Sequence, residues 1–270
     1  MISRVILALA AQCLALSAVL MCGGCGSKGE RALNVVGSTS IQPFAELLAQ
    51  EYEKKNTGKQ VDVQGGGSTA GLQAVANDLA DVGMCSRSLK ADEITRFSQV
   101  VIARDGIAIV VNKSNPMHAL TLDQIREIFA GRITDWKEMG GKPGPIRPIT
   151  REEGSGTRES FVHLVMGKDR ISRKVLTQES NGAVKELVKG DTAAIGYMSL
   201  GLVGEELSAL VINNAAPTSE NVLAGTYTLS RPFLFVTDGE AKPDAQKFID
   251  FVLSDDGQCL LEMEGLVRVR

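Results

Sequence analysis

The chain has 270 residues, with 32 acidic side chains, 29 basic side chains and two histidines. Its net charge of −3 argues against nucleic acid as a partner, because phosphate backbones are bound by basic surfaces. The length is sufficient for one large domain or for two lobes of ordinary size.

The first 25 residues have the pattern of an export signal. Arg4 precedes an apolar run of about 17 residues that is followed by small residues, which suits a signal peptide better than a spanning helix. The segment ends in Gly-Cys, which resembles a bacterial lipoprotein box with Cys25 as the acylated residue and Cys22 as the alternative. An ordinary secretory signal with incidental cysteines is the other interpretation. The exported chain loses only Arg4 among the charged side chains, which leaves 28 basic and 32 acidic side chains, a net charge of −4.

Two thiols, Cys85 and Cys259, remain if Cys25 is acylated. They could form a disulfide in an oxidising compartment, but their spacing does not show it, and two separately buried thiols are the favoured expectation. No Cys/His or HExxH spacing typical of a metal site occurs, so no metal and no cofactor are expected.

Segments rich in Val, Ile and Ala alternate with amphipathic stretches, which predicts an α/β chain. The predicted strands are, in chain order, Leu33–Val36, Gln60–Gln64, Asp81–Met84, Val100–Val111, Ile146–Thr150, Ala194–Tyr197, Ala209–Ile212 and Phe233–Val236. The clearest predicted helices are Ile41–Lys54, Leu72–Asn77, Leu122–Ala130 and Ala241–Leu253. In the first of them, Phe44, Leu47, Leu48 and Tyr52 follow a period near 3.6, so this face is expected in the core.

The sharpest boundary follows Val111, where a long apolar strand runs into the turn sequence N-K-S-N-P. A second crossing is expected within 226–232. The chain then leaves a first lobe, builds a second and returns to complete the first. We therefore predict that residues 26–111 and 231–270 form lobe 1, that residues 112–230 form lobe 2, and that loops from both face one cleft.

The stretch T-R-E-E-G-S-G-T-R-E-S, from Thr150 to Ser160, is the strongest functional signal. An arginine followed by a Gly/Ser/Thr turn that opens a helix offers a guanidinium fork, hydroxyls and free backbone N–H groups to a tetrahedral anion. Two arginines beside such a turn in an acidic protein favour an anion site. The alternative is a local ion pair of Arg151 with Glu152 or Glu153.

Three more loops share this chemistry. Gly37-Ser38-Thr39-Ser40 and the glycine-rich stretch 65–71 each precede a predicted helix. Cys85-Ser86-Arg87-Ser88 follows a predicted strand, and strand ends are where open α/β sheets hold ligands. Each loop alone is more typical of a turn and a helix cap. Together they predict one site for a tetrahedral anion.

Catalytic patterns are missing from the sequence. Neither the phosphate-loop motif G-x-x-x-x-G-K-[ST] nor the nucleophile elbow G-x-S-x-G occurs, and His118 and His163 lie in separate contexts. The chain is therefore expected to bind its anion without chemistry. Three alternatives stay open: a receptor for another oxyanion such as sulfate or molybdate, an exported phosphatase, and a sensory or adhesive lipoprotein.

Several motifs, in the same order along nearly the whole exported chain, carry a family resemblance. They read V-V-G-S-T-S-I-Q-P-F, Q-G-G-G-S-T-A-G, D-V-G-M-C-S-R-S-L, N-P-M-H-A-L-T-L-D-Q-I-R-E-I-F-A-G-R-I-T-D-W-K-E-M-G-G, T-R-E-E-G-S-G-T-R-E-S-F and A-A-I-G-Y. The chain resembles the periplasmic phosphate-binding proteins of ABC phosphate importers. This resemblance implies a two-lobed, type II solute-binding fold, each lobe a mixed sheet flanked by helices, that hands inorganic phosphate to membrane permease subunits. We expect a monomer, held by its lipid in the periplasm or on the outer face of the cell membrane.

The resemblance also implies a set of ligand contacts. The residues expected to contact phosphate are Thr39, Ser40, Ser68, Ser86, Arg151, Ser155, Gly156 and Thr157. Residues with supporting roles are Ser38, Thr69, Arg87 and Glu153. Among these, Glu153 stands where the family often has an aspartate that orients the arginine.

Position 86 departs from the family. Its best-known members carry an aspartate there that accepts the proton of bound phosphate and repels sulfate, whereas this chain has Ser86. A hydroxyl can accept or donate, so we suppose that Ser86 or a backbone carbonyl accepts this proton.

Overall fold

The computed structural model describes residues 31–269, and from Ala32 onward the described chain belongs to one compact unit. The predicted signal and Cys25 lie outside the described residues. No helix in the described part is long and apolar enough to cross a bilayer. The strands are β1 Leu33–Gly37, β2 Val61–Gly65, β3 Val82–Cys85, β4 Phe97–Asn112, β5 Ala119–Leu120, β6 Arg147–Arg151, β7 Leu176–Gln178, β8 Ala194–Ser199, β9 Leu207–Ala209, β10 Val211–Ile212 and β11 Ser230–Asp238.

Helices separate most of the strands. They are α2 Gln42–Lys55, α3 Ser68–Ala76, α4 Ala91–Ile94, α5 Leu122–Phe129, α6 Gly156–Phe161, α7 Asn181–Gly190, α8 Ser219–Leu223, α9 Pro243–Leu253 and α10 Asp255–Met263, with short turns η1 Trp136–Met139, η2 Val162–Met166 and η3 Leu200–Leu202. The predicted α/β class is confirmed, and the chain has the mixed α/β fold of the two-lobed type II binding proteins.

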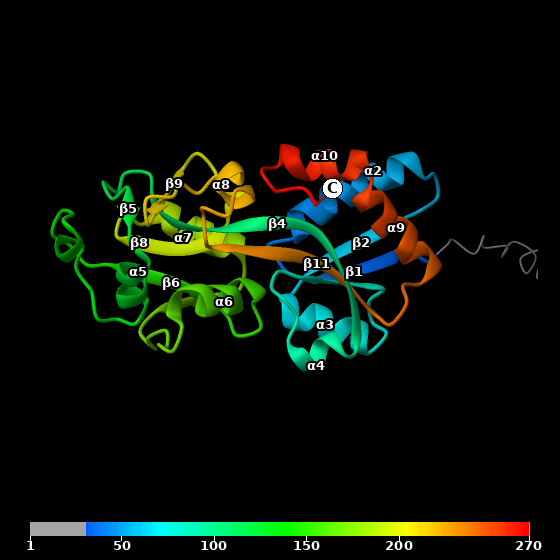
Figure 1. Cartoon of the computed structure of the whole chain (residues 1–270), viewed down its shortest axis with the longest axis horizontal. Coiled ribbons are helices and arrows are strands. Elements are labelled where there is room, and N and C mark those ends of the chain that lie inside the picture. Colours follow the sequence, from blue (N-terminus) through cyan, green and yellow to red (C-terminus); the bar gives the residue numbers. More distant parts are fainter. Residues whose placement is uncertain (1–30, 270) are drawn as a thin grey trace, which may run out of the picture. The chain divides into compact units, whose positions relative to one another are not determined.

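The main sheet has the strand order β2-β1-β3-β11-β4-β8-β6-β7. Strand β1 pairs in parallel with β2 and β3, while β11 runs antiparallel to both β3 and β4. At the other end, β8 pairs antiparallel with β4, and β6 lies parallel to β8 and β7. Strands β4 and β11 lie side by side and join the two halves of the sheet, as Figure 1 shows.

Strand β4 changes partner near its middle. Its first part, as far as Gly106, pairs with β11, and from Ile107 onward it pairs with β8. In this second part Ile107 and Ile109 enter one hydrophobic cluster, while Ala108 and Val110 enter another on the opposite face. Both faces of this second part are therefore covered, which explains the unbroken apolar sequence of Ile107–Val111.

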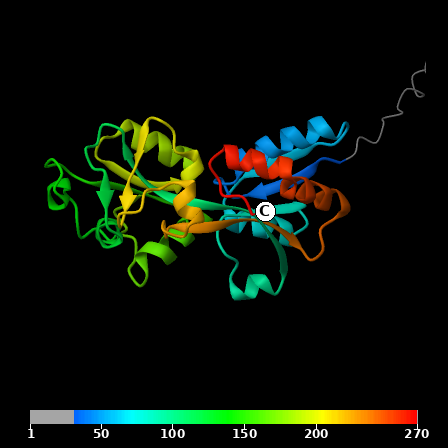
Figure 2. The same cartoon turned by 45° about the horizontal axis from the view of Figure 1, so that its top comes forward.

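Two packed regions flank β4. In the first half of the sheet, α2, α9 and α10 lie on one face and α3 and α4 on the other (Figures 1 and 2). Phe44, Leu48 and Tyr52 of α2 are buried there, which confirms most of the predicted core face, while Leu47 is only half-buried. In the second half, the ring of Phe161 stacks on Tyr197 with centroids 4.0 Å apart, which packs α6 against β8.

Two predictions need correction. The strand expected at 209–212 divides into β9, which pairs with β4, and β10, which pairs with β5, because the chain changes partner at Leu210. The thiols of Cys85 and Cys259 are both free, but only Cys85 is buried. Cys259 is exposed because it lies on the outer face of α10, whose buried face is formed by Gln258 and Leu261.

Candidate anion-binding site

Four of the predicted loops begin at the carboxyl ends of strands. Ser38 follows β1, the glycines before Ser68 follow β2, and Ser86 follows β3. Because β1 is parallel to both neighbours, these three ends lie at the same edge of the sheet. Arg151 is the last residue of β6, and Gly156 is the first of α6.

Buried hydroxyls from the first three loops contact one another. Ser38 Oγ donates to Ser86 Oγ at 2.8 Å, and Ser86 N donates to Ser68 Oγ at 3.0 Å. The hydroxyls of Ser68 and Ser86 lie 3.3 Å apart. These serines are almost fully buried. Each hydroxyl can both donate and accept, so the cluster can exchange these mutual bonds for bonds to an anion.

The turn between β6 and α6 meets this cluster. Thr157 Oγ1 lies 2.7 Å from Ser40 Oγ, and Thr69 N donates to Gly154 O at 3.1 Å. A Cβ atom added to Gly156 would lie 2.7 Å from Ser86 Oγ and would overlap Ser68 Oγ. Only glycine lets the backbone N–H of this position approach the hydroxyls so closely.

Arg151 is the cation of the site. Its side chain is 1% exposed, and its Nε and Nη2 donate to the carboxylate of Glu152 at 2.9 Å each. Nη2 also donates to Thr39 Oγ1 at 3.1 Å. Nη1 is buried and has no hydrogen-bond partner among the described residues. A buried guanidinium N–H without an acceptor is rare, and it indicates a ligand that accepts from it.

Two expected supporting residues lie elsewhere. Glu153 is exposed. The carboxylate that accepts from the Arg151 guanidinium is that of Glu152, the next residue in the chain. Arg87 turns away from the hydroxyls toward Glu93, with which it makes a bidentate pair at 2.7 and 2.8 Å. The structure thus gathers the other predicted residues and leaves these two outside. Those gathered are Ser38, Thr39, Ser40, Ser68, Thr69, Ser86, Arg151, Ser155, Gly156 and Thr157.

Ser155 acts mainly as a helix cap. Its hydroxyl accepts from Arg158 N at 3.3 Å at the start of α6, and the residue is buried. The cap holds the first turn of α6 in place. Its expected contact with a ligand stays a prediction.

Sequence analysis did not identify Asn181, the first residue of α7. Its Nδ2 donates to Ser40 Oγ at 2.7 Å, and its Oδ1 accepts from Ser199 N at 3.1 Å. The side chain is 1% exposed, so it adds an amide to the buried cluster. The available signal was Ser180, whose hydroxyl caps this helix as the loops before α5 and α6 are capped.

A buried ion pair, also missed, lies behind the hydroxyls. Arg231 donates through Nε and Nη2 to Asp105 Oδ2 at 3.1 and 2.9 Å, and through Nη1 to Thr157 Oγ1 at 2.7 Å. Ser199 Oγ donates to Asp105 Oδ1 at 2.8 Å. Burial raises the pKa of Asp105 and lowers the pKa of Arg231, while their mutual attraction opposes both changes. Charged residues inside two apolar strands were the available signal.

We expect the substitution Asp105→Asn to destabilise the protein by about 3 to 5 kcal/mol, because it leaves the Arg231 guanidinium buried without a counter-charge. Urea unfolding monitored by circular dichroism measures this free energy. The matched control is Asp238→Asn, whose partner Arg96 is half exposed, so the loss there should be about 0 to 1 kcal/mol. Equal losses in the two variants would contradict a buried pair at Asp105.

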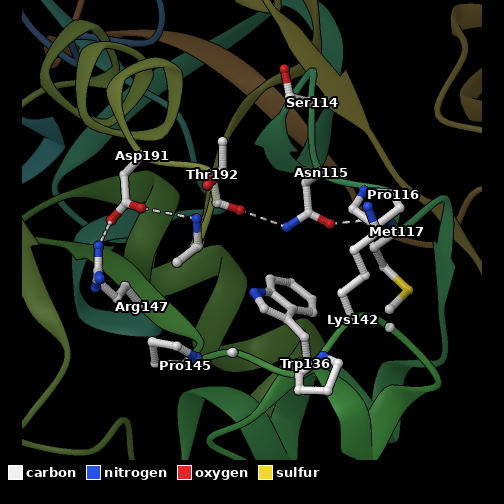
Figure 3. A pocket seen from close by; sticks show the side chains of 14 residues that line it. Ser114, Asn115, Pro116, Met117, Trp136, Lys142, Pro145, Arg147, Asp191 and Thr192 are labelled. Carbon is white, nitrogen blue, oxygen red and sulfur yellow. Dashed lines mark hydrogen bonds and ion pairs between the residues drawn. The ribbon is translucent and has the colours of Figure 1, made fainter.

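A separate cavity of 420 Å³ lies at the other end of β6. Figure 3 shows Trp136 and Asn115 among its lining residues, with the ion pair of Arg147 and Asp191 at its side. Asn115 Nδ2 is bonded to Thr192 O at 2.8 Å. Arg147 begins the strand that Arg151 ends, so the cavity lies apart from the hydroxyl cluster. Among the described residues, no cluster of His, Cys, Asp and Glu side chains could hold a metal ion.

Comparisons with known proteins show the family to which the chain belongs. Residues 26–256 match the family model described as a PBP superfamily domain. The chain is 30% identical over 235 residues to the phosphate-binding protein PstS of Bacillus subtilis, covering 86% of this chain and 78% of that protein. It is 26% identical over 254 residues to PstS of Borreliella burgdorferi, covering 89% and 91%.

Solved structures are similar as well. A phosphate ABC transporter substrate-binding protein from Clostridium perfringens, solved with bound phosphate, superposes with a TM-score of 0.86 at 37% identity, covering 89% of this chain and all of that one. An ABC-type phosphate transport receptor from Vibrio cholerae gives a TM-score of 0.73 at 37% identity, covering 87% and 99%.

Proposed function

The chain belongs to the PBP superfamily and, within it, to the PstS-type phosphate-binding proteins, and we propose that it is the extracytoplasmic receptor that delivers inorganic phosphate to an ABC importer. Like its relatives, it is a binding protein and not an enzyme. The observation that carries the proposal is Arg151, a buried guanidinium with one N–H unpaired at the point where the hydroxyl loops meet.

The anion is bound by charge on one side and by neutral donors on the others. Arg151 Nη1 donates to one phosphate oxygen, while Glu152 fixes the guanidinium from behind. The hydroxyls of Ser40 and Thr157 and the N–H of Gly156 supply further bonds. Because these groups are nearly fully buried, water is excluded and each bond to the charged ligand is strengthened.

Release requires the two sides to separate. We assign residues 26–111 and 231–270 to one lobe and 112–230 to the other, so that Ser40 and Thr157 approach from opposite lobes. Opening about β4 and β11, the two strands that link the halves of the sheet, frees the ligand. The open receptor then passes phosphate to the permease subunits.

The position of the protein in the cell follows from its N-terminal sequence. We infer that the signal is cleaved before Cys25 and that a lipid on Cys25 holds the receptor at the outer face of the membrane. The receptor acts as a monomer, since each chain supplies both sides of its own site.

Selectivity depends on neutral groups. Ser86 Oγ already accepts from Ser38, and Ser86 O accepts from Arg231 Nη1 at 3.2 Å. The buried carboxylate of Asp105 accepts hydrogen bonds from Arg231 and Ser199. The Arg231 side chain therefore stands between this carboxylate and the hydroxyl of Thr157. The proton of monohydrogen phosphate is therefore accepted by a hydroxyl or a backbone carbonyl, and sulfate, which has no such proton, loses that bond.

Titration calorimetry at neutral pH tests the function. Phosphate should bind at one site per chain. Sulfate should bind more weakly, because the hydroxyl or carbonyl that accepts the phosphate proton receives no hydrogen bond from sulfate. Sulfate binding as tight as phosphate binding would make the protein a general oxyanion receptor. Turnover of a phosphate ester by the metal-stripped protein would instead indicate a phosphatase.

A further inference from the structure

Arg87, which sequence analysis placed near the ligand, takes part in a group of ion pairs beside the site. Glu159 of α6 lies between two cations: its Oε1 is 3.0 Å from Arg87 Nε, and its Oε2 is 2.9 Å from Lys90 Nζ. The contact with Arg87 is a close ion pair and not a well-directed hydrogen bond, because Arg87 Nε makes no hydrogen bond to any acceptor among the described residues. The carboxylate therefore bridges two basic side chains.

The Arg87 side is rigid. Its guanidinium is 5% exposed and is held by both oxygens of Glu93, and Glu93 also accepts from Lys90 N at 2.8 Å. Burial alone would lower the pKa of Arg87, yet hydrogen bonds to Glu93 and the charge of Glu159 raise it above its usual value. Hydrogen bonding to Arg87 lowers the pKa of Glu93. At neutral pH the loop thus presents a fixed positive charge to Glu159.

Each partner adjoins a residue of the anion site. Arg87 follows Ser86 directly, and Glu159 lies two positions after Thr157 on α6. Ser160, the next residue of α6, donates through Oγ to Ser86 O at 3.3 Å. A movement that separates Thr157 from the serine loops therefore also separates Glu159 from Arg87.

The ion pairs lie beside a cavity next to the site. This cavity, of 510 Å³, is lined by Arg87, Lys90 and Glu159 and also by Arg231, whose Nη1 reaches the site at Thr157. Glu159 is thus placed where the two sides of the site meet the surface, and its side chain is 28% exposed.

We propose that Glu159 stabilises the phosphate-bound state by bridging Arg87 and Lys90, and that this bridge sets the rate at which phosphate leaves the site. This inference rests on the proposed function. Glu159 is a positioning residue, because it acts on the ligand through α6 and Arg87 and does not contact it. Interactions that form only when the site closes slow dissociation more than they change association.

The test is stopped-flow measurement of phosphate release from the full chain. Glu159→Gln should release phosphate about tenfold faster, with the association rate changed much less. Glu153→Gln removes the same charge from an exposed residue of the preceding loop that has no ion pair among the described residues, and it should release phosphate as the wild type does. Urea unfolding without phosphate checks that both variants fold.

A double-mutant cycle with Lys90→Gln separates the bridge that Glu159 forms between Arg87 and Lys90 from simple loss of charge. Lys90→Gln should speed release in the wild type but add nothing in the Glu159→Gln background. Equal release rates for the wild type and Glu159→Gln, or equal effects of Glu159→Gln and Glu153→Gln, would overturn the proposed role of Glu159. Neither result would contradict the proposed function as a phosphate receptor. A wild type that binds no phosphate would overturn the proposed function itself.

Discussion

Replacing Arg151 by Gln should weaken phosphate binding by about 2 to 5 kcal/mol, or roughly thirtyfold to several thousandfold. The glutamine keeps an amide donor but loses the charge, and the anion then lies in a buried cluster of neutral groups. The fold should persist, since the partner Glu152 is 26% exposed and can be hydrated when the arginine is absent. Titration calorimetry with phosphate measures the change.

The control for this variant comes from the same strand. Arg147 begins β6, is exposed and pairs with Asp191 beside the separate cavity (Figure 3). Arg147→Gln removes one positive charge at a comparable place in the sequence, and its phosphate affinity should match that of the wild type. Similar losses in the two variants would show that only net charge matters and would remove Arg151 from the site.

Gly156→Ala should reduce phosphate affinity more than a hundredfold. The new methyl group would overlap the hydroxyls of Ser68 and Ser86, so the turn must retreat from them. The Gly156 N–H and at least one hydroxyl then lose contact with the anion, and hydrogen bonds to charged groups contribute about 1.5 to 3 kcal/mol each. Gly156 does not have a positive φ, so the effect comes from the close approach and not from backbone strain.

Gly190→Ala is the matched control for this substitution. Gly190 is the last residue of α7, its φ is not positive, and a Cβ there would meet no atom within 4 Å. Its calorimetric affinity should equal that of the wild type. If Gly156→Ala kept wild-type affinity as well, the turn before α6 would not lie against the ligand.

The sequence predicted the features that depend on local pattern. Strand β4 contains the apolar run Ile107–Val111, and α2 repeats its buried residues at helical spacing, so both elements are predictable without tertiary information. The hydroxyl loops were also recognisable, because Gly, Ser and Thr gather at strand ends before helices. Their meeting was predicted from the chemistry that the loops share, and the contact between Ser40 and Thr157 now gives it a geometry.

Features that depend on contacts between distant segments were not predictable in this way. Asn181 reaches Ser40 across 141 positions, and Arg231 reaches Asp105 across 126. The Ser180 cap and the charges inside two strands mark these residues locally, but they do not identify the partner. The choice between Glu152 and Glu153 depends on the direction of one side chain at the end of β6, and the role of Arg87 depends on the position of α6.

Selectivity remains tied to Ser86. Its hydroxyl belongs to the network of Ser38 and Ser68, in which each hydroxyl can donate or accept. An aspartate at this position, as the family resemblance leads us to expect, would be a fixed acceptor that excludes sulfate by charge, whereas with Ser86 exclusion depends on the loss of one hydrogen bond. Discrimination should accordingly be weaker than a charged acceptor would give.

A crystal structure of the protein with phosphate tests the central claim most directly. It should show one tetrahedral anion within hydrogen-bond distance of Arg151 Nη1, of the Gly156 N–H and of the hydroxyls that now bond one another, with Glu152 still holding the guanidinium from behind. An anion bound at another place, or a saturated crystal in which Arg151 Nη1 has no anion beside it, would contradict the assignment of this cluster as the phosphate site.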